Sequence, residues 1–271
     1  MKNKIVSIIQ NNSNHIDQFL HYNARLAKDF KLNLDFVNNF ESVQSSLSPD
    51  AILGTGMPKS VGSSIKEVKT DVVRKVRNIV ASPMDEYNDI SYTVSNDNVV
   101  QQMYDKKTTS DLLLWTIGQE SEDSFFNQLF GTVETDLSKQ STLPTLTIPQ
   151  NCDYVKPETM IVVIRNTPKL DYSNLLTIKE NLGLRIVYVF HEDENAISTK
   201  EIMDSMSRDF KDFTGTVNTI SLEDDSLDKI IEHEKPQWIA FANYERSFLE
   251  RIYKPNSNQF TLSSKLPVLN F

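Results

Sequence analysis

Cysteine and glycine are scarce in this chain of 271 residues. Cys152 is the only cysteine, which excludes an internal disulfide and a zinc cluster built on cysteines, and which fits a reducing compartment. Of the 7 glycines, none follows Gly215, and none belongs to a G-x-x-x-x-G-K-[ST] phosphate loop. The sequence therefore argues against a disulfide framework and against a P-loop nucleotidase.

Long apolar runs and concentrated positive charge are also missing. No run approaches the roughly 18 apolar residues that span a bilayer, and the run from Ile5 to Ile9 is too short for a signal-peptide core. The net charge of −9 is shared evenly, because residues 1–150 carry 14 basic and 18 acidic side chains and residues 151–271 carry 14 and 19. We therefore expect a cytoplasmic protein whose partners include neither nucleic acid nor a membrane.

Short apolar runs alternate with helical patterns throughout the first half of the chain. The run Lys4–Gln10 predicts a buried strand, and the segment that follows it places apolar residues on one helical face. The same alternation continues as far as Pro149. We predict strands at residues 4–10, 32–37, 90–94, 110–118 and 143–148, and helices at residues 14–30, 64–79, 98–105 and 125–139.

The pattern restarts after the polar segment Pro149–Pro157. Gly183 should end the first helix of this second half, since glycine favours the left-handed conformation that closes a helix. The same order of elements in both halves implies a duplication. We predict strands at residues 160–164, 184–190, 216–221, 237–242 and 266–271, and helices at residues 171–182, 198–213, 227–231 and 246–253.

The two tryptophans support this duplication. Trp115 precedes the segment Leu143–Leu146 by 28 positions, and Trp238 precedes Leu266–Leu269 by the same 28 positions. Strands that are separated by helices need crossover connections and therefore run parallel. The sequence predicts an α/β protein with two tandem doubly wound sheets, one in residues 1–150 and one in residues 151–271.

The end of the first half carries a glycine motif. It reads Gly118-x2-Ser121-x9-Gly131-Thr132 and is followed by the apolar edge segment Leu143–Pro149. This arrangement resembles the universal stress protein family in its tandem two-domain form, whose nucleotide-binding members carry G-x2-G-x9-G followed by Ser or Thr. Over nearly the whole chain, the resemblance implies two five-stranded parallel sheets of the adenine nucleotide alpha hydrolase-like type, related by a pseudo-two-fold axis.

The resemblance also implies a site and an assembly. Gly118, Ser121, Gly131, Thr132 and Gln10 stand at the positions that would bind a nucleotide cofactor. The two edge strands would pair the two domains within one chain, and they would also allow a homodimer, because exposed sheet edges need cover.

The motif departs from the family pattern in both halves. Ser121 replaces the middle glycine, where the backbone must approach phosphate closely. Gln10 ends the first strand, where nucleotide-binding relatives place an aspartate. When the strand is aligned instead, Thr116 and Gln119 occupy the first two glycine positions. The second half has lost the signature, since its counterpart loop, residues 241–247, contains no glycine.

The charge around the motif disfavours a triphosphate. No Lys or Arg occurs between Thr108 and Ser138, and the loop after the strand carries Glu120, Glu122 and Asp123. Two like charges about 4 Å apart cost about 1 kcal/mol in water and about 4 kcal/mol at an effective dielectric of 20. Magnesium and backbone amides at a helix start would offset only part of this repulsion.

Catalytic and metal patterns are absent from the sequence. His15 and His21 are six positions apart on one helix and do not share a face, and no Ser, His and Asp set has a nucleophile-elbow context. The sequence favours a non-catalytic stress-response binding or regulatory protein with a degenerate nucleotide site and no cofactor. The alternative is a true binder of ATP or another adenine nucleotide with Mg²⁺, with slow ATPase or nucleotide-sensing activity in the first domain.

Overall fold

The computed structural model describes residues 3–10, 16–39, 70–79, 90–95, 111–118, 144–149, 152–165, 173–191, 216–220, 226–242 and 265–270. The chain forms two compact units, which we call unit 1 (Met1–Leu137) and unit 2 (Ser138–Phe271). None of the described helices is long and apolar enough to cross a membrane.

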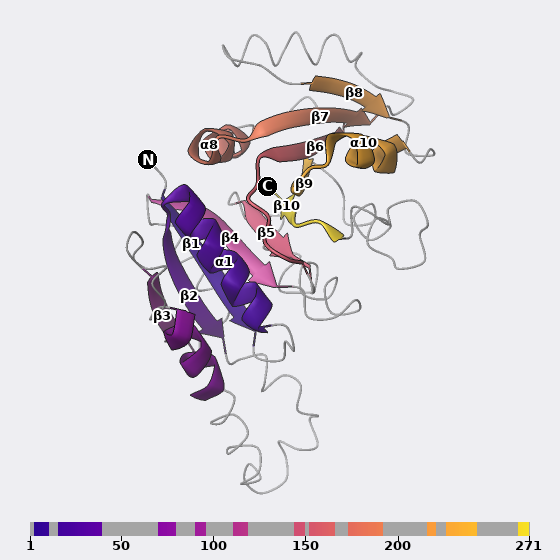
Figure 1. Ribbon diagram of the computed structural model, residues 1–271. Coiled ribbons are helices and arrows are strands. Elements are labelled where there is room, and N and C mark those ends of the chain that lie inside the picture. Colours follow the sequence, from indigo (N-terminus) through magenta and orange to yellow (C-terminus); the bar gives the residue numbers. More distant parts are fainter. Residues whose placement is uncertain are drawn as a thin grey trace, which may run out of the picture. The chain divides into compact units, whose positions relative to one another are not determined.

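Unit 1 contains a parallel sheet in the strand order β3-β2-β1-β4 (Figure 1). Helix α1 connects β1 to β2, and residues 70–79 form a further helix before β3. The elements of unit 1 are β1 (Lys4–Gln10), α1 (Ile16–Phe30), β2 (Asn33–Asn39), β3 (Ile90–Ser95) and β4 (Leu112–Gly118).

Unit 2 repeats this order with the strands β8-β7-β6-β9-β10, all parallel. A further strand, β5, pairs antiparallel with β10. Helices α8 and α10 connect strands in opposite directions across the sheet, so right-handed crossovers place them on opposite faces. The elements are β5 (Thr145–Ile148), β6 (Thr159–Arg165), α8 (Ser173–Leu182), β7 (Arg185–His191), β8 (Thr216–Ile220), α10 (Ser226–Glu234), β9 (Trp238–Ala242) and β10 (Val268–Asn270).

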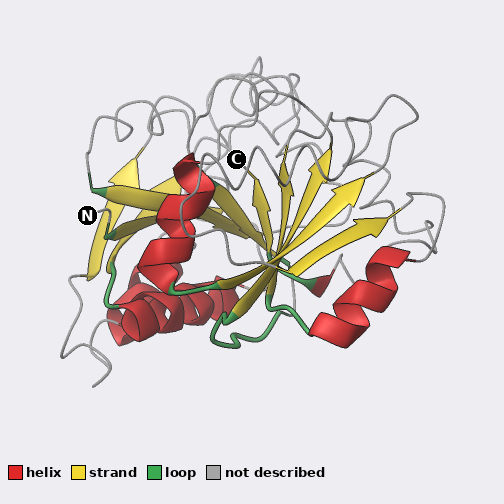
Figure 2. Cartoon of the chain, turned by 90° about the horizontal axis from the view of Figure 1, so that it is seen from above, coloured by secondary structure: helices red, strands yellow, loops and turns green. Residues whose placement is uncertain are grey.

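The central strands form the core of each unit. Strands covered on both faces read as continuous apolar runs, as β4 and β6 do here. Trp115 on β4 is 1% exposed and Trp238 on β9 is fully buried, which confirms that both tryptophans are core residues. Within each unit the strands twist relative to one another, as Figure 2 shows.

Three helices end on a residue in the left-handed conformation. At the end of α1, the N–H of Leu32 donates to the carbonyl oxygen of Ala27 (2.8 Å), and an equivalent bond closes α8. These bonds satisfy carbonyl groups that would otherwise lack a partner at the helix terminus. The residues with positive φ are Lys31 (54°), Gly183 (62°) and Lys235 (46°).

The predicted doubly wound α/β fold is confirmed. All ten predicted strands are present, with bounds within two residues of those expected. The two predicted edge strands do pair, through Leu146 and Leu269 among others. This pairing groups β5 with unit 2, so the compact units divide at residue 137, and the assignment of residues 1–150 and 151–271 to two family domains stays a prediction. The helices predicted at residues 98–105, 125–139, 198–213 and 246–253 lie outside the described residues.

Candidate functional site

The point at which the chain reverses direction in the sheet of unit 1 lies between β1 and β4. From β1 the chain passes through α1 to β2 on one side, whereas β4 lies on the other side of β1. In open parallel sheets a crevice forms at such a switch point, outside the carboxyl ends of the strands. Gln10 and Gly118 are the last residues of β1 and β4, so both lie at this edge.

The structure thus brings together two of the five predicted site residues. Gln10 and Gly118 share the carboxyl edge of the sheet, one strand apart. Ser121, Gly131 and Thr132 lie outside the described residues, so their place in a nucleotide site stays a prediction.

Gly118 has a packing role that the motif did not predict. An ideal Cβ at this position would lie 3.1 Å from Cδ2 of Phe19, which is closer than an ordinary van der Waals contact. Phe19 belongs to the first turn of α1 and is 7% exposed. A glycine at position 118 therefore lets α1 approach the end of β4 closely.

Three fully buried polar side chains meet beside this contact. Ser7 on β1 and Thr116 on β4 are paired in register, and Asn23 comes from α1. Thr116 Oγ1 lies 2.7 Å from Ser7 Oγ and 2.7 Å from Asn23 Oδ1. Asn23 Nδ2 donates to the backbone oxygen of Phe19 at 2.8 Å. We call Ser7, Asn23 and Thr116 the buried polar cluster.

The inventory of donors fixes the direction of these hydrogen bonds. A threonine hydroxyl has one proton, and the amide oxygen of an asparagine can only accept. Thr116 must therefore donate to Asn23, and Ser7 must donate to Thr116. The cluster joins β1, β4 and α1 through one ordered chain of hydrogen bonds.

A second polar group is centred on β2. The carboxylate of Asp35, a residue 5% exposed, accepts hydrogen bonds from Ser91 Oγ at 2.8 Å and from Thr93 Oγ1 at 3.4 Å. Lys4 Nζ lies 3.8 Å from the same carboxylate. Lys4 begins β1 and so lies at the amino edge of the sheet, away from Gln10 and Gly118. Its charge therefore cannot serve an anion at the carboxyl edge.

The switch point of unit 2, between β6 and β9, is apolar. The register pairs there are Val162 with Ala240 and Val163 with Phe241, and all four residues are buried. Helix α8, the counterpart of α1, buries only apolar side chains, namely Leu175, Ile178 and Leu182.

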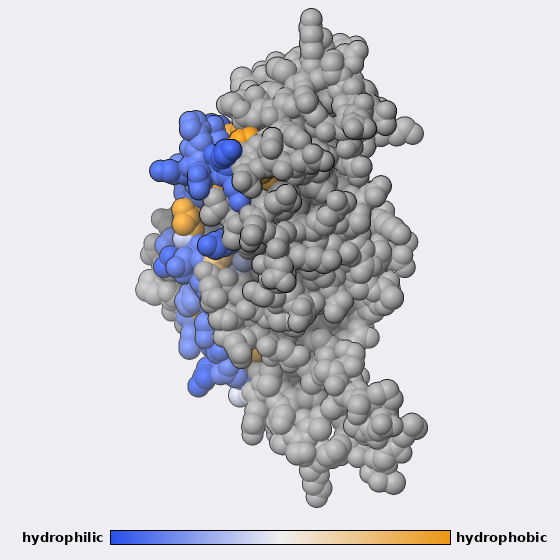
Figure 3. Space-filling view, turned by 90° about the vertical axis from the view of Figure 1, so that its right-hand side faces the viewer, coloured by the Kyte–Doolittle hydropathy of each residue, from blue (hydrophilic) through white to orange (hydrophobic). Residues whose placement is uncertain are grey.

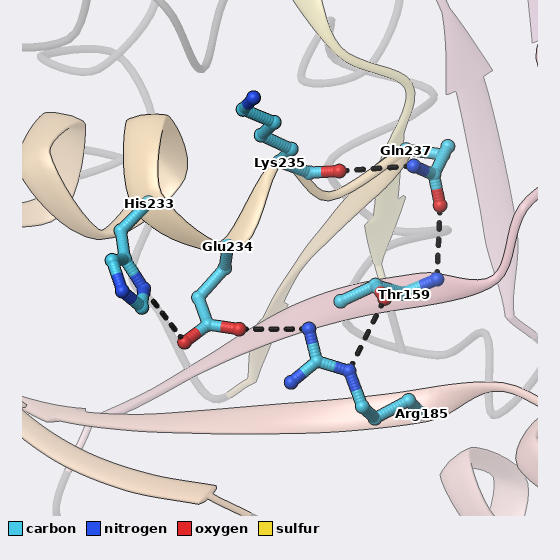
Figure 4. Close-up of polar contacts among 6 residues, drawn as sticks. All are labelled: Thr159, Arg185, His233, Glu234, Lys235 and Gln237. Atoms are coloured by element: carbon cyan, nitrogen blue, oxygen red, sulfur yellow. Dashed lines mark hydrogen bonds and ion pairs between the residues drawn. The ribbon is translucent and has the colours of Figure 1, made fainter.

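Polar contacts in unit 2 gather instead at the amino ends of its strands (Figure 4). Gln237 Oε1 accepts hydrogen bonds from the backbone N–H groups of Glu158 and Thr159, both at 2.9 Å. Its amide nitrogen donates to the backbone oxygen of Lys235 at 2.9 Å. This side chain fixes the start of β6 against the start of β9.

An ion pair extends the same group of contacts. Arg185 donates to Thr159 Oγ1 at 3.3 Å and to Glu234 Oε2 at 2.7 Å, and His233 Nδ1 lies 3.2 Å from Glu234 Oε1 (Figure 4). The hydrogen bond from Arg185 lowers the pKa of the Glu234 carboxyl below its ordinary value. These residues lie at the amino edge of the sheet, opposite to the switch-point edge, where they join β6, β7 and α10.

Metal ligands do not gather in the described part of the chain: it contains no group of three or more His, Cys, Asp or Glu residues that could hold an ion. Burial raises the pKa of the Cys152 thiol to about 11, which makes it a poor nucleophile at neutral pH. On the side shown in Figure 3, the described surface is mostly hydrophilic, with small separated hydrophobic areas. Among the described residues, Val155 is the only large hydrophobic residue that is exposed.

Sequence reasoning missed the buried polar cluster, although the sequence held a signal for it. Ser7 interrupts the apolar run of β1, and Thr116 interrupts that of β4. A lone polar residue in a strand buried on both faces needs a hydrogen-bond partner. The pairing of the two positions could not be read without the register of the strands.

Comparison with known proteins gives relatives in structure alone. No family model matches the chain, and no curated protein matches it in sequence. A universal stress protein from Archaeoglobus fulgidus DSM 4304 is 13% identical with a TM-score of 0.58, over 100% of this chain and 96% of that one.

Two further structures match at a TM-score of 0.50. One is the cytoplasmic domain of a prokaryotic cation chloride cotransporter, 8% identical, over 100% of this chain and 95% of that one. The other is a protein of unknown function from Pseudomonas aeruginosa PAO1, 9% identical, over 99% of this chain and 92% of that one. At such low identity the likeness concerns the fold, and the predicted resemblance to universal stress proteins is confirmed at that level.

Proposed function

We propose that this protein is a non-catalytic binding or regulatory protein of the tandem universal stress type, and that the nucleotide site of its first half is degenerate. The contact between Gly118 and Phe19 carries the proposal. It accounts for the first glycine of the motif by helix packing, so this glycine does not require a phosphate group beside it. Because one fold can serve many functions, the proposal rests on the site and not on the likeness in fold.

The charge at the switch point supports the same proposal. The three carboxylates of Glu120, Glu122 and Asp123 follow Gly118 closely in sequence, and no Lys or Arg occurs between Thr108 and Ser138. Among the described residues, the strand ends at the carboxyl edge of unit 1 are uncharged. Lys75 reaches the first turn of α1, but its charge is already paired with the carboxylates of Asp17 (3.0 Å) and Asp71 (3.3 Å). A phosphate there would meet repulsion that backbone amides relieve only in part.

The alternative proposal is an adenine-nucleotide binder with slow ATPase or nucleotide-sensing activity. It is favoured by the position of Gly118 at a switch point and by the spacing from Gly118 to Gly131 and Thr132. In this case Gly118, Ser121, Gly131 and Thr132 would hold the phosphates with Mg²⁺, and Gln10 would lie near the nucleoside.

Calorimetry with ATP and Mg²⁺ distinguishes the two proposals. We expect no binding at micromolar concentration for the natural sequence. Micromolar binding that is lost in Gly131→Leu, but kept in the matched control Gly62→Leu, would establish the alternative. Both glycines lie in unit 1, and only Gly131 belongs to the motif.

The assembly and location of the protein also remain proposals. Strand β10 pairs with β9 on one side and with β5 on the other, so it is not open to a second chain. A homodimer, which the resemblance implies, would have to use another surface, and light scattering that shows only monomer would remove it. We propose that the protein works in the cytoplasm, since its single cysteine fits a reducing compartment.

A further inference from the structure

The buried polar cluster of unit 1 is not needed to form the fold. Unit 2 has the same strand order with apolar side chains at its switch point. Burying hydroxyl and amide groups costs free energy that their mutual hydrogen bonds only just recover. Such a cluster adds little net stability, but its hydrogen bonds are all satisfied in one geometry only. It therefore favours one arrangement of the surrounding elements over others.

The geometry of the cluster connects it to the edge of the sheet. Thr116 lies two residues before Gly118 on β4, and Asn23 lies one helical turn after Phe19 on α1. Asn23 is bonded at both ends, because its amide oxygen accepts from Thr116 and its amide nitrogen donates to the backbone of Phe19. The bond to Phe19 lies within α1, whereas the bond from Thr116 joins α1 to β4. A shift of α1 along β4 would therefore break the bond between Thr116 and Asn23, and it would also move the ring of Phe19 away from Gly118.

We propose that Ser7, Asn23 and Thr116 are positioning residues that hold α1 in one register on β4, and so fix Phe19 against Gly118 at the switch point. They would not touch a ligand themselves. Any effect of these residues on ligand binding rests on the proposed function, whereas their effect on the position of Phe19 does not.

The position of Phe19 can be measured without a ligand. In the natural sequence we expect a nuclear Overhauser effect between the Phe19 ring and the Gly118 α-protons, together with slow amide exchange in the second turn of α1, where the N–H groups have carbonyl partners within the helix. The triple variant Ser7→Ala, Asn23→Leu and Thr116→Val replaces the cluster by apolar groups of similar volume. Such a replacement can leave the unfolding free energy nearly unchanged.

The expected result separates positioning from general stability. We expect the triple variant to stay folded, to lose the Phe19–Gly118 effect, and to exchange the amides of this part of α1 about tenfold faster. The single variant Thr116→Ser keeps the hydroxyl, so it should keep both the Phe19–Gly118 effect and the slow exchange of the natural protein. As a matched control, Val187→Ala in the core of unit 2 should lower stability and leave both signals as they are.

Two outcomes would overturn the proposal. One is a folded triple variant that keeps the Phe19–Gly118 effect and the slow exchange, and the other is a Thr116→Ser variant that behaves like the triple variant. Titration with ATP and Mg²⁺ as the probe is a separate arm. If the natural protein binds the probe while Phe19 is shown to move freely, the positioning proposal is contradicted and the nucleotide-binding alternative is not. If the natural protein does not bind and Phe19 is fixed, only the nucleotide-binding alternative fails.

Discussion

The two units have the same strand order, but the side chains at their switch points differ in polarity: they are polar in unit 1 and apolar in unit 2. At the switch point of unit 1, Ser7 and Thr116 face Asn23 of the helix, whereas the register pairs of unit 2 are Val162 with Ala240 and Val163 with Phe241. At the amino edge of unit 2, by contrast, Gln237 bonds to the start of β6. A buried polar cluster thus lies at the switch point of unit 1, whereas the described polar contacts of unit 2 gather at the amino ends of its strands.

This difference separates the requirements of the fold from those of a site. Parallel strands and right-handed crossovers need apolar strands and well-closed helices, which both units have. Among the described residues, the buried polar cluster occurs in the half that carries the motif, and no such cluster lies at the switch point of the half that lacks it.

The largest expected effect comes from making the switch point of unit 1 apolar and, in a second variant, making that of unit 2 polar. Thr116→Val leaves the Asn23 oxygen and the Ser7 hydroxyl without a partner in the cluster, at a cost of about 2–4 kcal/mol of unfolding free energy. Val163→Thr buries a hydroxyl among apolar side chains and should cost about 1–3 kcal/mol.

Each unit has its own fluorescent reporter for this measurement. Trp115 lies in unit 1 and Trp238 in unit 2, so urea unfolding in a Trp238→Phe or a Trp115→Phe background follows one unit at a time. Equal stability of Thr116→Val and the parent protein would show that the cluster carries no hydrogen-bond free energy.

The next effect concerns the end of β4. Gly118→Val would push its side chain into the ring of Phe19, and overpacking of this kind costs about 1–3 kcal/mol. The second substitution Phe19→Leu should recover part of the loss, because the smaller side chain frees the space. A loss that is equally large with and without Phe19→Leu would assign the glycine to another constraint. The corresponding strand of unit 2, β9, ends with Phe241 and Ala242 and has no glycine there.

A smaller effect should appear at the amino edge of unit 2. Glu234→Gln removes the charge that bonds to the half-exposed Arg185, and we expect a loss of about 1 kcal/mol at pH 7. The pKa of Glu234 is lowered in the folded protein, so its stabilisation is present above the ordinary value of 4.5 and is lost as pH falls through the folded value. Unfolding curves of the two proteins should therefore converge in acid, and a constant difference down to pH 2 would contradict this assignment.

The smallest effect concerns the two equivalent helix ends, Lys31 after α1 and Gly183 after α8. The left-handed conformation is unfavourable for lysine and free for glycine. Lys31→Gly should therefore stabilise unit 1 by up to about 1 kcal/mol, and Gly183→Lys should destabilise unit 2 by a similar amount. The free space around Gly183 means that conformation alone sets the cost, since nothing lies within 4 Å of a Cβ built there. Thermal unfolding of both variants tests the sign of the change in stability, and a lower stability of Lys31→Gly would contradict this prediction.

The sequence predicted the fold well because its signals are local. Apolar runs gave all ten strands, and Gly183 marked the end of α8. The end of α1 carries lysine in the same conformation, and there the glycine signal fails. The pairing of β5 with β10 was expected from the resemblance to the universal stress protein family, and not from a local signal.

The candidate site was only partly predictable because its contacts are between distant segments. The motif predicted a ligand-binding role for Gly118, but not its contact with Phe19, which comes almost a hundred residues earlier. Ser7 and Thr116 are 109 positions apart, and only the strand register makes them neighbours. No local pattern contains that information.

The pairing of β5 with β10 has a consequence for the synthesis of the chain. Leu146 and Leu269 are register partners, yet they are 123 positions apart. At about 5–20 residues per second, β10 is completed some 6–25 seconds after β5. Through that interval the apolar strand Thr145–Ile148 lacks its β10 neighbour, so one edge of the strand can pair with another chain.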